Sequence, residues 1–188
     1  MVVFDDGRLH VHRALLSAES QYFDAMFKRD LGNKGIFEVD LQYVPIHAAW
    51  RTLSLIYSRS YTVAAAPSVS KADNDNELTR HARVYQLARY WGLSKNLQNL
   101  SFHHFGQALQ EDWELEDILL TLSILLHPTF PGYFKVFSDV DLHEDRMVKL
   151  ILKTLPENLK EADKLFLKLY LDLSPFRHMI QKSFPELD

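Results

Sequence analysis

Cysteine is absent from this sequence of 188 residues. Without thiols the chain can form neither disulfides nor thiolate metal sites, and it has no cysteine nucleophile. Glycine is scarce, and its six residues are not clustered as a phosphate-binding loop. The G-x-S-x-G and H-E-x-x-H patterns of serine hydrolases and zinc peptidases do not occur. We therefore expect no catalytic residues, no cofactor and no metal site, so the chain is not predicted to be an enzyme.

A strong excess of one charge is also lacking. The 21 Lys and Arg residues face 25 Asp and Glu residues, which gives a formal net charge of −4. Nucleic acid and membranes are therefore not expected partners. The longest apolar-looking run, at 118–126, is too short to cross a bilayer. The first residues, M-V-V-F-D-D-G, have no secretory pattern, so we expect an intracellular protein of the cytoplasm or nucleus.

The sequence does contain apolar residues at regular spacing. Hydrophobic residues make up 47% of the chain, which suffices for the core of one domain, or of one domain with an extension. The Asp-Gly turn at 5–8 predicts a hairpin with strands at 2–4 and 9–11, and alternation predicts a third strand at 37–41. Apolar spacings of three and four predict helices at 19–27, 46–57, 78–91, 97–108, 118–126, 147–155, 165–173 and 174–180.

Four segments follow one another in the order of a known domain. The first is V-H-R-A-L-L-S-A-E-S-Q-Y-F-D-A-M-F at 11–27, and the second is F-E-V-D-L at 37–41. The third is W-R-T-L-S-L-I-Y at 50–57, followed by Tyr61, and the fourth is V-Y-Q-L-A-R-Y-W-G-L at 84–93. Together they resemble a BTB/POZ domain, a module that binds other proteins and has no chemistry of its own.

The resemblance implies an α+β fold, in which a small sheet packs against helices. Residues 1–110 would form the BTB/POZ-like domain, with a polar loop at 64–77, and residues 111–188 a helical extension packed on it. The insert and the helical tail are similar to the fungal branch of the family. The candidate residues for self-association are Val2, Val3, Phe4, Arg13 and Leu16. The candidate face for another protein is formed by Trp50, Tyr57 and Tyr61.

The first strand, at 2–4, bears directly on self-association. It has no Pro or Lys to protect it, so we expect an exposed edge that can pair with a second chain. The family usually has an Asp just before this strand that takes part in a charged pocket at the dimer interface. Here no residue corresponds to it, although Arg13 matches the basic partner, and this departure counts against a strand-swapped homodimer.

Two pairs of histidines could suggest a metal site. His10 and His12 lie two residues apart on a predicted strand, so their rings share a side, but a metal needs at least one further ligand. We favour a buried His12 that is hydrogen-bonded to backbone where the strand meets the helix. His103 and His104 are neighbours in a predicted helix and diverge by about 100°.

An acidic cluster surrounds Trp113, with Glu111, Asp112, Glu114, Glu116 and Asp117. Catalysis would need two of these carboxylates to converge on a pocket. Acids at the start of a helix are more simply explained by the helix dipole. A surface for basic residues of a partner is a third interpretation.

The leading hypothesis is a non-enzymatic protein-interaction module, with homotypic or heterotypic partners. A cullin-type adaptor of ubiquitin ligases is a second hypothesis. Cullin-binding members often carry a hydrophobic residue two places before a Glu, and 57–76 contains no such pair. A third hypothesis is the dimerisation part of a transcriptional regulator, and a fourth is an enzyme of unfamiliar type.

Overall fold

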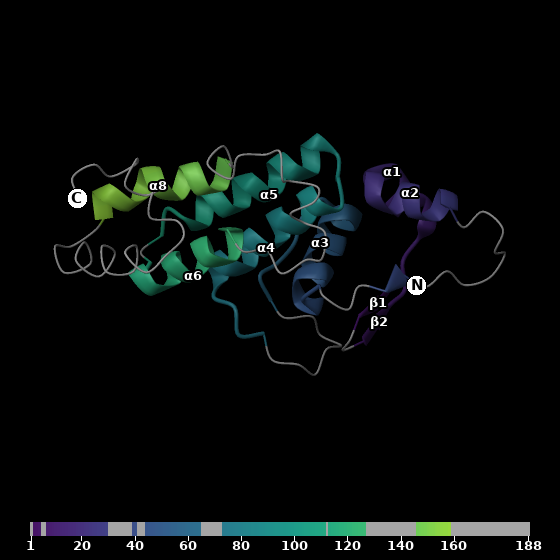
Figure 1. Cartoon of the computed structure of the whole chain (residues 1–188), viewed down its shortest axis with the longest axis horizontal. Coiled ribbons are helices and arrows are strands. Elements are labelled where there is room, and N and C mark those ends of the chain that lie inside the picture. Colours follow the sequence, from purple (N-terminus) through teal and green to yellow (C-terminus); the bar gives the residue numbers. More distant parts are fainter. Residues whose placement is uncertain are drawn as a thin grey trace.

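The computed structural model describes residues 2–4, 7–29, 39–40, 44–64, 73–111, 113–126 and 146–158. Helices dominate these residues (Figure 1). They are α1 Arg13–Glu19, α2 Gln21–Arg29, α3 Ile46–Ser58, α4 Glu77–Tyr90, α5 Lys95–Ala108, α6 Leu115–Leu126 and α8 Arg146–Asn158. The strands are β1 Val2–Phe4, β2 Gly7–Leu9 and β3 Val39–Asp40. The helices predicted at 165–173 and 174–180 lie outside the described residues.

The predicted α+β fold is wrong, because the chain is mostly helical. The strands are only two or three residues long, and they contact chiefly one another. A strand pair of this length cannot cover the apolar face of a helix. The helices therefore build the core by packing on one another. Of the strand predicted at 37–41, the structure describes Val39 and Asp40, which form β3.

The three strands pair in the order β2-β1-β3. A hairpin is present, since Val2 lies opposite Leu9 and Phe4 opposite Gly7 in an antiparallel register. Its second strand is Gly7–Leu9, however, and not the predicted 9–11. β3 pairs with the other side of β1 in parallel, with Val2 opposite Val39. The expectation that residues 2–4 form an exposed edge is therefore wrong, because β1 lies in the middle of the three strands.

Two hydrophobic clusters share α4. The first lies among α1, α2, α3 and one side of α4, and its buried residues include Leu16, Phe23, Phe27, Ala49, Leu53, Ile56, Val84, Leu87, Trp91 and Leu97. The second lies among α4, α5, α6 and α8, and includes Leu78, Ala82, Tyr85, Phe105, Leu119, Leu122, Leu125, Met147 and Ile151. Figure 1 shows α1 and α2 at one end of the long axis and α6 and α8 at the other.

The helices beyond residue 110 make polar as well as apolar contacts with α4 and α5. The hydroxyls of Thr79 on α4 and Thr121 on α6 are 3.0 Å apart and buried. The Gln86 side chain of α4 donates to the carbonyl of Ile124 at 2.7 Å. These bonds satisfy polar groups that packing removes from water, so α6 is held on α4 in one register.

Gly92 supplies the left-handed backbone that separates α4 from α5. Its φ is +57°, and a Cβ built on it would lie 3.2 Å from the Cβ of Gln21. We expect Gly92→Ala to lower the free energy of unfolding by about 1–2 kcal/mol, measured by urea denaturation. Gly106→Ala is the matched control, because Gly106 lies within α5 and its Cβ would lie 3.5 Å from the Leu150 side chain of α8, an ordinary contact distance. Equal destabilisation by both variants would contradict this explanation.

Candidate functional site

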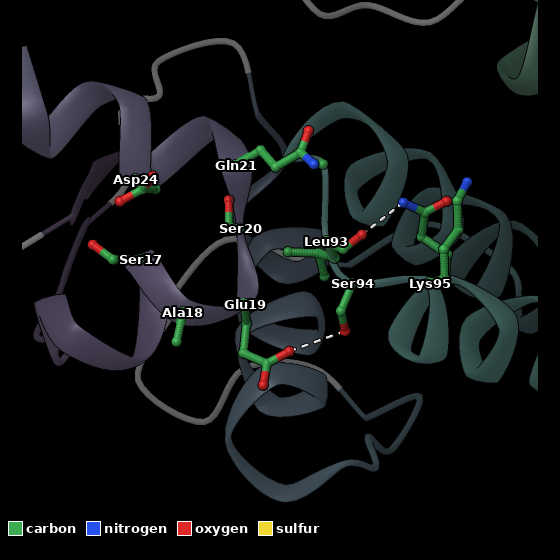
Figure 2. A pocket seen from close by; sticks show the side chains of 11 residues that line it. Ser17, Ala18, Glu19, Ser20, Gln21, Asp24, Leu93, Ser94 and Lys95 are labelled. Carbon is green, nitrogen blue, oxygen red and sulfur yellow. Dashed lines mark hydrogen bonds between the residues drawn. The ribbon is translucent and has the colours of Figure 1, made fainter.

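The corner between α1 and α2 is joined to the corner between α4 and α5 (Figure 2). Ser20 and Leu93 form an antiparallel bridge, and the Ser94 backbone N–H donates to the Glu19 carbonyl at 3.0 Å. The buried Ser20 hydroxyl donates to the carbonyl of Trp91 at 2.6 Å. The Ser94 hydroxyl donates to the Glu19 carboxylate at 3.0 Å. The two helix corners are about seventy residues apart in sequence, and these bonds hold them side by side.

Glu19 also binds the end of α3. Arg59, which ends α3 in a left-handed conformation at φ 58°, pairs with the Glu19 carboxylate. The Arg59 hydrogen bond lowers the pKa of Glu19 against the opposing effect of burial, and the Ser94 hydroxyl adds to the lowering. The carboxylate of Glu19, at the end of α1, thus contacts the end of α3 and the start of α5, which is a structural role.

A cavity of about 390 Å³ opens beside this junction (Figure 2). Its lining includes the polar residues Ser17, Asp24, Lys95 and Gln98. No histidine lies among the described residues that line it, so the serines there have no imidazole base to activate them. We assign this cavity no catalytic role.

His12 lies at the start of α1 and is exposed, contrary to the prediction of a buried residue bonded to backbone. Its ring Nδ1 is 3.0 Å from the hydroxyl of Tyr57, near the end of α3, and its backbone N–H donates to the same hydroxyl at 2.6 Å. The prediction failed because a partner 45 residues away replaced a local one. Tyr57 is 41% exposed, and its ring is held in one orientation by these two contacts.

The other two residues of the predicted partner face are less accessible than Tyr57. Trp50 is half-buried on α3. Tyr61 is only 8% exposed, and it belongs to the first core. The three aromatic residues therefore do not form one exposed patch, and Tyr57 is the member that a partner can reach.

The residues predicted for self-association fall in different environments. Arg13 is exposed, lies 5.0 Å from the centre of the Phe27 ring and donates to the Phe27 carbonyl at 2.6 Å. Leu16 is fully buried in the first core. Val2, Val3 and Phe4 form β1, whose neighbours occupy both sides of its backbone.

A cluster of three rings was missed from the sequence. The Tyr61 hydroxyl is 2.7 Å from Nδ1 of His81, and the His104 ring lies 6.2 Å from that of His81, nearly parallel to it. Burial lowers the pKa of His81 to about 4, with smaller contributions from the charges of His104 and Arg51. Burial likewise raises the pKa of Tyr61 and lowers that of His104. No periodicity links 61, 81 and 104, so only the helix packing reveals the cluster.

This cluster predicts a loss of stability in acid. Because folding lowers the pKa of His81 from 6.5 to about 4, the unfolded chain binds an additional proton between these values. The stabilisation that comes from keeping His81 neutral should be fully present above pH 6.5, and the free energy of unfolding should fall as the pH is lowered toward 4. Urea denaturation at several pH values should show this fall. His81→Gln should flatten the slope in that range, whereas His10→Gln, at an exposed position, should leave it unchanged. An unchanged slope in His81→Gln would contradict the assignment.

A buried ion pair lies beside the ring cluster. The Arg51 side chain on α3 is 1% exposed, and Asp73, with which it pairs, is 5% exposed. Arg51 also donates to the carbonyl of Val63 at 2.7 Å, and Arg80 contacts the same Asp73 carboxylate at 3.2 Å. Burial acts to raise the pKa of Asp73, but the positive groups around it outweigh that effect and lower it. Asp73 belongs to the loop predicted at 64–77, and its carboxylate joins this residue to α3 and α4.

The acids around Trp113 match the helix-dipole interpretation better than a catalytic one. Glu116 and Asp117 lie in the first turn of α6, and Asp117 accepts a hydrogen bond from Asn76 at 2.6 Å. Trp113 donates its ring N–H to the Ala108 carbonyl at 2.6 Å. Within the described residues, no three His, Asp or Glu side chains are grouped so that they could hold a metal ion.

A comparison with family models decides the family. The model of the BTB/POZ domain matches residues 1–98, just over half of the chain. The chain belongs to the BTB/POZ family. The match covers all four segments on which the resemblance rested, from the hairpin to the start of α5. No curated protein and no solved structure matches the chain in the corresponding searches.

BTB/POZ domains mediate interactions between proteins, including dimerisation. In this BTB/POZ chain the surface residue Tyr57, the junction of Figure 2 and the ring cluster all involve residues of the matched region. The part of the chain that the structure describes has no helix both long and apolar enough to cross a membrane.

Proposed function

We propose that this BTB/POZ chain binds a protein partner through the surface around Tyr57 and catalyses no reaction. The observation that carries the proposal is the exposed Tyr57 ring, fixed between α3 and α1 by its contacts with His12. Exposed tyrosines are frequent anchors of protein interfaces, and an anchor that is already ordered loses little entropy on binding.

The test compares two truncations of exposed apolar side chains. Tyr57 and Leu120 are the large hydrophobic residues that are most exposed among those described, at 41% and 47%. We expect Tyr57→Ala to reduce partner recovery in quantitative affinity purification by about tenfold or more, while Leu120→Ala retains it. Tyr57→Phe keeps the ring but loses the bonds to His12, so an intermediate loss is expected. Equal recovery with Tyr57→Ala and Leu120→Ala would refute the proposal.

Self-association is a second proposal, supported by membership of a family whose domains dimerise. The candidate residues are Val2, Val3, Phe4, Arg13 and Leu16. Because Leu16 is buried and β1 is flanked on both sides, exposed Arg13 is the residue to test. Light scattering should show a dimer whose dissociation Arg13→Glu promotes. A monomer at high concentration would remove this proposal.

Two narrower roles remain proposals: a cullin-type ubiquitin-ligase adaptor and the dimerisation part of a transcriptional regulator. The first is tested by binding to a purified cullin, and the second requires the dimer of the preceding paragraph. Membership of the fungal branch of the family is also a proposal, supported by the polar insert at 64–77 and the predicted helical extension.

A further inference from the structure

A second cavity, of about 350 Å³, lies where the segment after α3 meets α4 and α5. Aromatic rings and carboxylates line it together. Tyr61 and His104 contribute rings whose centres are 5.1 Å apart at 69°, and His81 contributes the third ring described above. Glu77, at the start of α4, and Glu111, just after α5, contribute the carboxylates.

The described lining of this cavity carries negative charge. Glu77 is 46% exposed and Glu111 is exposed, and neither Lys nor Arg is among the described lining residues. Arg51 and Arg80 are not among the described lining residues, and both contact the Asp73 carboxylate. A cation that enters therefore meets two carboxylates that are accessible to it.

His81 adds an uncharged acceptor. Its Nε2 atom lies 3.9 Å from Oε1 of Glu77, which is too far for a direct hydrogen bond. One donor nitrogen can nevertheless lie within about 3 Å of both atoms. The Tyr61 hydroxyl can accept from Nδ1 of His81, and this tautomer leaves the Nε2 lone pair free to accept from a ligand.

We infer that this cavity binds a basic side chain, the guanidinium of arginine or the ammonium of lysine, presented by a partner protein. The cation lies against the ring faces of Tyr61 and His104 and donates to Glu77 and to Nε2 of His81. Cations are attracted to aromatic faces, and hydrogen bonds to a carboxylate are stronger when the donor is charged. The inference goes beyond the proposed function, because the Tyr57 surface can bind its partner whether or not this cavity is occupied.

The experiment is an NMR titration of the full chain at pH 7 with three peptides. Each is capped at both ends and has two glycines on either side of a central arginine, lysine or citrulline. We expect the arginine or the lysine peptide to shift the ring C–H signals of His81 and His104. The citrulline peptide, of the same shape as the arginine peptide but neutral, should not. Arginine and lysine are distinguished by which peptide binds more tightly. Equal shifts with citrulline, or no shift with any peptide at low-millimolar concentration, would overturn the inference.

Variants test the carboxylates. Glu77→Gln and Glu111→Gln should each weaken binding of the basic peptide by about tenfold. Glu116→Gln is the control, because it removes the same charge from an exposed residue of α6 that does not line the cavity. An equal loss in Glu116→Gln would show that general charge attraction explains the binding, and would overturn the inference. Circular dichroism of each variant checks that the helical content of the chain is unchanged.

Discussion

Asp73→Asn is expected to lower the free energy of unfolding by about 3 kcal/mol. The substitution keeps the size of the side chain but removes its charge. Arg51 then remains 1% exposed, without the carboxylate that compensates its charge. Removing one partner of a buried pair is more harmful than removing both, because the remaining ion is neither hydrated nor paired. Arg80 loses the same partner and adds to the effect.

Urea denaturation of three further variants separates this explanation from a simple loss of contacts. Asp75→Asn is the matched control, since Asp75 pairs with Arg83 in the same segment but both side chains are more exposed, at 21% and 16%. Asp75→Asn should lower the free energy of unfolding by about 1 kcal/mol or less. The double variant Arg51→Met/Asp73→Asn should be more stable than Asp73→Asn alone, because it no longer buries an unpaired charge. The single variant Arg51→Met completes the double-mutant cycle. Equal losses in Asp73→Asn and Asp75→Asn would contradict the role of burial.

Phe23→Ala should have a larger effect and lower the free energy of unfolding by about 4 kcal/mol. Phe23 on α2 is fully buried, and its ring lies 5.1 Å from that of Trp91 and 6.1 Å from that of Phe27. Truncation would leave a cavity between α2 and the end of α4, in the first core. The lost transfer free energy and the unfilled volume both destabilise the fold.

The same denaturation measurement checks this value. Lys28→Ala provides the control on the same helix, because its side chain is 70% exposed and its bridge to Asp24 joins neighbouring turns. It should change stability by about 0.5 kcal/mol or less. A loss in Phe23→Ala no greater than in Lys28→Ala would mean that α2 is not part of the cooperative core.

Local patterns predicted most of the described helices, because each pattern depends on residues three or four apart. The helix predicted at 19–27 left out α1 and the break at Ser20 between α1 and α2. The prediction of 46–57 corresponds to α3 and that of 78–91 to α4, each within one residue at either end. Gly92, which follows α4, has the left-handed conformation that glycine often adopts at the end of a helix. Ser94 lies at the N-cap of α5, a position that serine favours, but it makes no side-chain cap bond there.

Contacts between distant segments could not be predicted in the same way. Nothing near His12 in sequence indicates Tyr57, and nothing near Arg51 indicates Asp73. The position of β1 between its neighbours depends on β3, which is more than thirty residues away. Alternation at 37–41 indicates an extended segment, but it does not show that Val39 and Asp40 pair with β1.

The shared helix α4 determines how this chain can be divided. Val84, Leu87 and Ala88 face the first core, while Leu78, Ala82 and Tyr85 face the second. The family match ends at residue 98, within α5. A fragment cut at that boundary would expose to water the apolar side of α4 that α6 and the rest of α5 cover, and such a surface promotes aggregation. Recombinant fragments that retain α6 and α8 should therefore stay in solution where the shorter one precipitates.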